Sequence, residues 1–430
     1  MKLSRLVILF LAFFLAPGPA RGQQPGAENA NAPLVRGKIQ IPGLPPMDDA
    51  APPAPAAPTA PGLSGIPGIS PTTIRIGSYA PFSGPTAPWG AVARGVEAFL
   101  MMVTEEGGIE GRALKLVMFD NKYDPITTMA GVRKLGEEED VFAFVGGVGT
   151  DPGLAARDYI VQKGIPWVGP VSGSPAFAFP PQKNIFAIAP PSQGEAATLV
   201  KYSVEVLGLQ KIGVIFCDDG FGRAGFQGAE EQLKKYNLRP AAAAAVHPQD
   251  LDLKDEVAGL ARAGLQTVII WLGPTQAILV KKEAESAGFE PAWMTGSALG
   301  DPVTMDRLTS RRWAGTIFTA FCEPPDSSET LVREYHGAFE KFATPGERWG
   351  AFFLTGFGLA EPLVEGLKLC GAMPTRENFI SRMETLKDFK GVLGRISYGP
   401  NQRQGQTEIF ICQALPNGRT QRLTGWFTPR

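Results

Sequence analysis

Thr150 has the neighbours that an anion-binding residue needs. It follows the glycine-rich run Gly146–Gly149 and precedes Asp151 at the expected start of a helix. At such a position a threonine can cap the helix, or its hydroxyl and the nearby free N–H groups can bind an anion. The glycine run resembles a phosphate-binding loop, but no Gly-Lys-Ser or Gly-Lys-Thr follows it, so we expect no nucleotide site.

A second group of hydroxyl residues follows the predicted strand 166–168. Ser172 and Ser174 flank Gly173, which has no Cβ and therefore lets the backbone approach a ligand closely. A polar turn before Pro175 would have the same sequence. The candidate residues of this segment are Val171, Ser172, Gly173 and Ser174.

Residue types needed for catalysis or metal binding do not cluster in the sequence. The two histidines, His247 and His336, lie neither beside a serine or cysteine motif that would indicate a nucleophile nor among clustered metal ligands. No set of acid, base and nucleophile can be assembled. We therefore expect a binding protein that is not an enzyme and that uses no metal or cofactor.

The stretch from Ile74 to Arg112 shows which elements would position a ligand. A strand ends at Gly77, a loop rich in glycine and proline follows, and an apolar-periodic helix runs from about Trp89 to Glu106 before the next strand begins near Leu114. This order predicts a βαβ unit. Its loop lies at the carboxyl end of a strand, where open α/β sheets bind ligands.

The alternation of strands and helices continues and restarts once, which predicts an α/β fold of two doubly wound parallel-sheet lobes. The first lobe is expected to contain strands 114–119, 141–145 and 166–168 with helices 125–138 and 151–163. After strand 185–189, the second is expected to contain strands 211–217, 240–246, 267–272 and 293–296 with helices 193–207, 222–235, 253–263 and 274–287. The cleft between the two lobes is the expected site.

The N-terminal segment has the pattern of an export signal. Lys2 and Arg5 precede an apolar run, 6–16, and Ala20 to Gly22 supply the small residues of a cleavage site, so residues 1–22 are predicted to be a signal peptide. The run is shorter than the roughly 20 residues that span a bilayer. No cysteine follows it to carry a lipid anchor. We expect a soluble mature protein in the periplasm, beginning with a disordered linker rich in proline and alanine, residues 23–72.

Charge and cysteine content limit the partners further. The chain has 41 basic and 42 acidic residues and a formal net charge of −1, without a basic stripe, so nucleic acid is not an expected partner. The four cysteines match no metal or redox motif. Cys217 lies in an apolar strand and is expected in the core, whereas a disulfide among Cys322, Cys370 and Cys412 stays open.

Four segments together resemble one family, the leucine/isoleucine/valine-binding proteins, which are type I periplasmic solute-binding components of ABC importers. The order and spacing of these segments carry the resemblance: 74–85, 119–125, 146–150 and 218–222. It implies two lobes joined by three crossovers, with residues 73–190 and 320–390 in lobe 1 and residues 191–319 and 391–430 in lobe 2. It also implies a monomer that closes around a ligand and is recognised by a permease of the inner membrane.

The same resemblance implies the site. The ligand's carboxylate would be held by Thr150 and by the segment Val171 to Ser174. Trp89 matches an aromatic that lines the family's pocket, and Phe221 stands where the family often has a tyrosine, which makes the pocket more apolar. From lobe 2, Pro274 and Ser297 are further candidate ligand-binding residues.

Ser297 is the main departure from the family pattern. Family members that bind amino acids have an acidic residue in this loop, and it pairs with the ligand's ammonium group. Burying an ammonium without a counter-charge costs several kcal/mol. The sequence therefore favours a less cationic, more apolar ligand, such as an aromatic or aliphatic carboxylic acid or an amide, although branched-chain amino acid-like solutes stay in the set. Four acids could replace the missing charge: Asp218, Asp219, Asp301 and Glu323.

Two other roles fit the same fold. The chain could be the ligand-sensing domain of a regulatory system, or a periplasmic carrier of a hydrophobic solute such as a lipid. A permease gene beside this gene would favour import, and a kinase or regulator gene would favour sensing.

Overall fold

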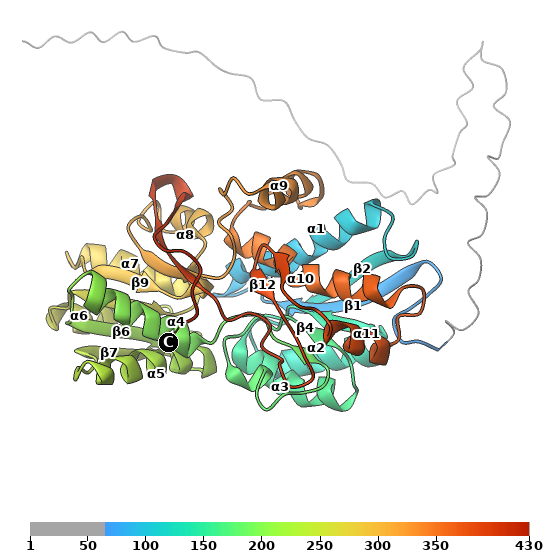
Figure 1. Ribbon diagram of the computed structural model, residues 1–430. Coiled ribbons are helices and arrows are strands. Elements are labelled where there is room, and N and C mark those ends of the chain that lie inside the picture. The colour runs from blue at the N-terminus through green and yellow to red at the C-terminus, as the bar shows by residue number, and fades with distance from the viewer. Residues whose placement is uncertain (1–64, 430) are drawn as a thin grey trace, which may run out of the picture. The chain divides into compact units, whose positions relative to one another are not determined.

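The computed structural model describes residues 65–429 (Figure 1). The predicted signal peptide lies outside these residues, as does the predicted linker up to residue 64. The last linker residues are joined to the fold, because Gly68 N donates to Asp140 Oδ2 at 3.2 Å and Ile69 forms a β-bridge with Ile74. Within the described part of the chain, no helix has the length and apolar character needed to cross a membrane.

The first sheet has five parallel strands in the order β2-β1-β3-β4-β5. They are β1 (Thr73–Ala80), β2 (Ala113–Asp120), β3 (Ala143–Val145), β4 (Trp167–Val168) and β5 (Ile185–Phe186). The connecting helices are η1 (Ala87–Gly90), α1 (Ala91–Glu105), α2 (Pro125–Glu137), α3 (Thr150–Gln162) and η2 (Pro175–Phe177). Three later helices complete this lobe by packing on α1 and on one another: α9 (Thr330–Phe342), α10 (Ala351–Cys370) and α11 (Arg376–Met383).

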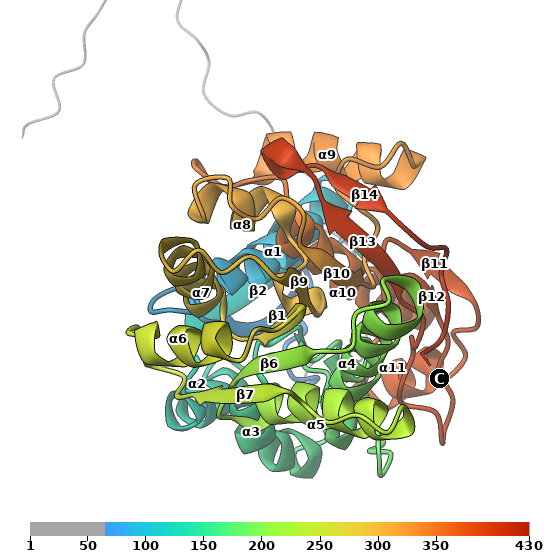
Figure 2. The same cartoon turned by 90° about the vertical axis from the view of Figure 1, so that its left-hand side faces the viewer.

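The second sheet has seven strands in the order β14-β13-β10-β9-β8-β6-β7 (Figure 2). They are β6 (Ile212–Cys217), β7 (Ala242–Val246), β8 (Thr267–Trp271), β9 (Ala292–Thr295), β10 (Ile317–Ala320), β13 (Phe410–Ala414) and β14 (Thr420–Arg422). The helices are α4 (Ser192–Lys201), η3 (Tyr202–Val206), α5 (Gly220–Lys235), α6 (Lys254–Arg262), α7 (Pro274–Ser286), η4 (Ser297–Leu299), α8 (Pro302–Leu308) and η5 (Pro416–Gly418). The α/β prediction is confirmed. The structure adds two strands at one edge of this sheet: β13 pairs antiparallel with β10, and β14 pairs antiparallel with β13.

In both sheets, the strand order reverses beside the first strand, β1 or β6. The order β2-β1-β3 in one sheet and β7-β6-β8 in the other sends the chain to opposite sides of β1 and of β6. A crevice forms where successive connections diverge in this way, beyond the carboxyl ends of the strands. The helical turns that begin after β1, β3 and β6 carry Trp89, Thr150 and Phe221 respectively. The topology therefore explains why residues far apart in the sequence come together.

The hairpin of β11 (Phe389–Gly391) and β12 (Gly394–Ile396) leads into a segment that packs on the first sheet. Ala187 N donates to Arg403 O at 2.8 Å, and the Arg403 guanidinium donates to the carbonyl oxygens of Gln182 and Lys183. We infer that the last crossing between the lobes comes after Gln404, later than residue 391.

All four cysteines are buried free thiols: Cys217, Cys322, Cys370 and Cys412. The structure thus contains none of the disulfides that the sequence left open. Cys217 lies in β6 and packs in the core of the second lobe, as its apolar strand predicted.

Candidate functional site

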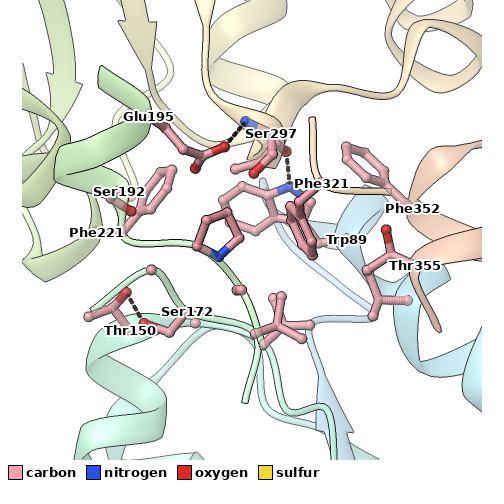
Figure 3. Close-up of a pocket in the computed structure, with 18 of the residues that line it drawn as sticks. Trp89, Thr150, Ser172, Ser192, Glu195, Phe221, Ser297, Phe321, Phe352 and Thr355 are labelled. Carbon is pink, nitrogen blue, oxygen red and sulfur yellow. Dashed lines mark hydrogen bonds between the residues drawn. The ribbon is translucent and has the colours of Figure 1, made fainter. Parts of the chain in front are cut away.

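One cavity is lined by residues of both lobes (Figure 3). About 90 Å³ of it is open to the centre of a water molecule. Since roughly 10–15 Å³ of such space holds one water, a small organic group fits in place of several waters. Most of the predicted site residues line this cavity together: Trp89, Thr150, Val171, Ser172, Gly173, Phe221 and Ser297.

Thr150 and Ser172 form a buried pair of hydroxyls on the first-lobe side. Their Oγ atoms lie 2.8 Å apart, and each residue is less than 9 % exposed. Thr150 does not cap α3 with its side chain, because Gly149 is the N-cap residue, with a φ of 117°, and no side-chain cap bond forms there. Of the two roles that the sequence allowed, the structure thus excludes plain capping. The hydroxyl pair is left facing the cavity.

Ser174 and Pro274 do not line the cavity. Ser174 Oγ accepts a hydrogen bond from Ala176 N at 3.4 Å and so caps η2, as a polar turn would. Pro274 is the first residue of α7, and its neighbour Thr275 donates its N–H to Pro85 O at 3.3 Å across the lobes. Both residues therefore support the surroundings of the cavity without facing it.

Gly173 lines the cavity and also packs against the first crossover. A Cβ on Gly173 would lie 2.3 Å from Ser192 Oγ and 2.6 Å from Ser192 N. The same two residues are joined by a hydrogen bond from Ser192 N to Gly173 O at 3.0 Å. The glycine is therefore required by the close approach of the crossover, whatever occupies the cavity.

Aromatic rings form the wall that joins the lobes. Trp89 Nε1 donates to Ala298 O at 2.7 Å, and the Trp89 ring meets Phe221 edge-on with 5.8 Å between centroids. Tyr123 also packs on Trp89, with 5.6 Å between the ring centroids. Phe321 and Phe352 extend this apolar lining. The interpretation of Trp89 and Phe221 as cavity residues thus agrees with where they lie.

Glu195 is the one acidic residue among the described lining residues, and sequence reasoning missed it. It lies in the first turn of α4, is 4 % exposed, and its Oε1 accepts hydrogen bonds from Ser297 N at 3.2 Å and Thr319 Oγ1 at 2.8 Å. Burial raises its pKa to about 7, and the Ser297 and Thr319 donors only partly offset that effect. A carboxyl group from another element therefore lies beside Ser297, and it is none of the four acids that the sequence offered as replacements.

None of the four acids that the sequence offered as replacements lines the cavity: Asp218, Asp219, Asp301 and Glu323. Asp219 and Asp301 cap α5 and α8, which is the usual role of a buried aspartate at a helix start. Asp218 pairs with Arg223, and Glu323 pairs with Arg422.

Four helices begin at the cavity, since Thr150, Ser192, Phe221 and Phe352 lie in the first turns of α3, α4, α5 and α10. A helix N-terminus carries a partial positive charge and, where it is uncapped, free N–H groups, both of which favour an anion. At α5 and α10 the carboxylates of Asp219 and Asp301 already accept from Gly222 N and Phe352 N, so the free N–H groups are those of α3 and α4. No lysine, arginine or histidine is among the lining residues that the structure describes. The cavity is therefore suited to an anionic or polar group held by hydroxyls and backbone, next to an apolar body.

The sequence analysis did not predict several other residues that line the cavity. They include Val92, Tyr123, Val148, Gly149, Ala189, Pro190, Ser192, Ala298, Phe321, Phe352 and Thr355.

Residues 73–419 match the family model described as periplasmic binding protein. Among curated proteins, the chain is similar to Leu/Ile/Val-binding protein homolog 1 of Brucella suis, with 22% identity over 334 residues that cover 76% of this chain and 86% of the relative.

Two solved structures show how widely this fold is shared. A substrate-binding periplasmic protein from Ralstonia solanacearum aligns with a TM-score of 0.76 and 22% identity, over 81% of this chain and 99% of the other. A fatty acid ABC transporter substrate-binding protein from Thermomonospora curvata aligns with a TM-score of 0.73 and 18% identity, over 86% of this chain and 96% of the other. At these identities, the structural matches concern the fold.

Proposed function

The chain belongs to the periplasmic binding protein family, whose members bind solutes and are not enzymes, and on this premise we propose that it captures a small organic solute by closing its two lobes. The proposed solute is branched-chain amino acid-like, an amide or an apolar carboxylic acid, and it is delivered to an ABC importer of the inner membrane. The cavity lined from both lobes is the observation that carries this proposal. We also propose export by a cleaved signal peptide and action as a monomer.

Closure needs contacts from both sides. A ligand shifts the lobes toward the closed form only by as much as it binds that form better than the open one. Thr150 and Ser172 would supply polar contacts from the first lobe, and Phe221, Glu195 and Ser297 would act from the second. Trp89 lies between them, with its own hydrogen bond to Ala298.

A carrier of long-chain lipids is the weaker alternative. The similarity to the fatty acid transporter protein and the aromatic wall support it. The space of about 90 Å³ supports a small solute instead.

A thermal-shift panel tests the proposal. Amino acids, amides, aromatic and aliphatic acids and a long-chain fatty acid would each be titrated against the purified mature protein. A solute that binds the native state raises the melting temperature as its concentration rises. At one hundred times Kd, the free energy of unfolding increases by about 2.7 kcal/mol. We expect a response to a small solute and slower uptake of that solute by cells without the gene. The absence of any response at millimolar concentration would contradict solute capture, and a response to the fatty acid alone would favour the carrier.

A further inference from the structure

Glu195 is the only acidic side chain among the described residues that line the cavity, and no cationic side chain there balances it. Its Oε1 is taken by the two protein donors, Ser297 N and Thr319 Oγ1. Within residues 65–429, no hydrogen bond reaches its Oε2. Figure 3 shows the carboxyl group on the wall opposite Thr150 and Ser172. One oxygen of a buried carboxyl group is therefore available to a ligand.

The elements packed against α4 add no charge at this position. Strands β9 and β10 and the η4 turn contribute hydrogen-bond donors and no charged group to Glu195, from Ser297 and Thr319. On α5, Arg223 pairs with Asp218, Lys234 pairs with Glu230, and the N-cap residue Asp219 accepts from Gly222 N. Tyr123, the other titratable residue of the lining, stays neutral because burial raises its pKa well above 10.

We propose that the cavity takes an apolar monocarboxylate together with one proton on Glu195, whose Oε2–H then donates a hydrogen bond to the solute. This inference rests on the proposed function and names its solute class. The proton comes from solvent and is held on Oε2, and no covalent bond forms. The carboxylate would lie between the Thr150–Ser172 hydroxyls and Glu195, with its apolar body against Trp89 and Phe221.

Charge balance is the reason why Glu195 would be protonated when a carboxylate binds. A carboxylate beside ionised Glu195 would place two negative charges in a buried cavity whose lining has no cationic side chain, and like charges at short range strongly disfavour joint ionisation. Protonation removes this repulsion and turns Oε2 from an acceptor into a donor. Because burial already holds the pKa of Glu195 at about 7, little free energy is needed to protonate it near neutral pH. A solute with an ammonium group would need the opposite state, ionised Glu195.

The sign of the pH dependence therefore identifies the solute class. The probes are 4-methylpentanoate and benzoate, with L-leucine as the matched solute that adds an ammonium group to the 4-methylpentanoate skeleton. Isothermal titration calorimetry at pH 6 to 8.5, in two buffers of different ionisation enthalpy, gives the affinity and the number of protons exchanged. We expect the affinity of a monocarboxylate to fall about tenfold for each pH unit above the pKa of Glu195, with close to one proton taken up per solute at pH 8.

Glu195→Gln separates the role of the proton from that of folding. Glutamine can still accept from Ser297 and Thr319 and permanently presents an N–H where the protonated acid presents an O–H. The variant should bind the monocarboxylate without pH dependence and more tightly than the wild type at pH 8. Glu361→Gln is the matched control, because Glu361 is an equally buried glutamate whose partner is Tyr335 and which does not line the cavity. It should keep the wild-type pH slope.

Three results would overturn this inference. They are proton release on binding, tight binding of leucine with neither monocarboxylate bound at any pH, and an unchanged pH slope in Glu195→Gln. In each case a solute that responds in the wider thermal-shift panel would leave the proposed function intact. The proton count on the wild-type protein remains decisive if the variant folds poorly.

Discussion

The indole nitrogen of Trp89 donates to the carbonyl oxygen of Ala298 at 2.7 Å, so one side chain bonds the first lobe to the second at the cavity wall. Further hydrogen bonds cross between the lobes, among them those from Thr275 N to Pro85 O, from Gly220 N to Asp151 Oδ2 and from Phe352 N to Asp301 Oδ2. These bonds would have to break if the lobes moved apart. Under the proposed function, Trp89 would thus link solute contact to lobe closure.

Replacing Trp89 with phenylalanine should weaken solute binding while leaving the fold intact. The ring contacts with Phe221 and Tyr123 are largely kept, but the hydrogen bond to Ala298 is lost, and such a bond contributes about 0.5–1.5 kcal/mol. We expect a loss of roughly two- to tenfold in affinity by calorimetry with the solute that responds in the panel. Trp293→Phe, a tryptophan outside the cavity, is the control. Equal affinity in the two variants would show that the bond is irrelevant to closure.

Removing the Thr150 hydroxyl should cost affinity more than stability. Thr150→Val preserves shape but leaves the Ser172 hydroxyl without its partner at 2.8 Å. A lost hydrogen bond to a charged group costs about 1.5–3 kcal/mol, so we expect binding of a carboxylate to weaken by at least tenfold. Thr150→Ser keeps the hydroxyl and should bind within a few-fold of the wild type. If the valine variant binds as well as the serine variant, Thr150 does not hold the solute.

Gly173→Ala should destabilise the folded protein even without solute. Its Cβ would come within 2.6 Å of the Ser192 backbone nitrogen, so the crossover must shift. Overpacking of this kind typically costs 1–3 kcal/mol, which denaturant unfolding would detect. Gly259→Ala is the control, since that glycine lies in α6 with open space around it and alanine is the better helix former. The Gly173 prediction fails if both variants are as stable as the wild type.

Stability should fall as pH rises from about 5 to 7, partly because of Glu361. Burial raises its pKa from 4.5 to about 7, so over this range the folded protein holds a proton that the unfolded chain has released. A shift of this size corresponds to a loss on the order of 3 kcal/mol, complete above the folded pKa. Glu361→Gln should flatten the dependence of the melting temperature on pH between 5 and 8. A slope as steep as that of the wild type would rule out this contribution.

Local sequence was sufficient for most of the fold. Parallel strands buried on both faces are short apolar runs, and the helices between them begin and end at recognisable signals. The predicted helix 125–138, for example, is Pro125–Glu137 in the structure, with Asp124 as its N-cap. The strands β13 and β14 were not predicted. The pairing of β13 with β10 depends on residues at least ninety positions apart, and β14 joins the sheet only through β13.

The cavity was predictable where strand ends determine it and unpredictable where distant contacts do. Ser192 and Glu195 have the spacing of a capping box, a pattern that assigns the glutamate to its own helix. In the structure it bonds instead to Ser297 and Thr319, which are 102 and 124 positions away. Tyr123 was missed because a left-handed backbone, with a φ of 59°, turns it toward Trp89.

The four helices that begin at the cavity have a consequence for how ionic strength acts. Their partial charges are fixed parts of the backbone, and dissolved ions screen buried charges far less than exposed ones. The affinity for an anionic solute should therefore vary little between dilute and concentrated salt. The whole chain has a formal net charge of −1, and loss of Lys2, Arg5 and Arg21 with the predicted signal peptide would make it −4, so no attractive long-range field steers an anionic solute and it should reach the cavity by unassisted diffusion.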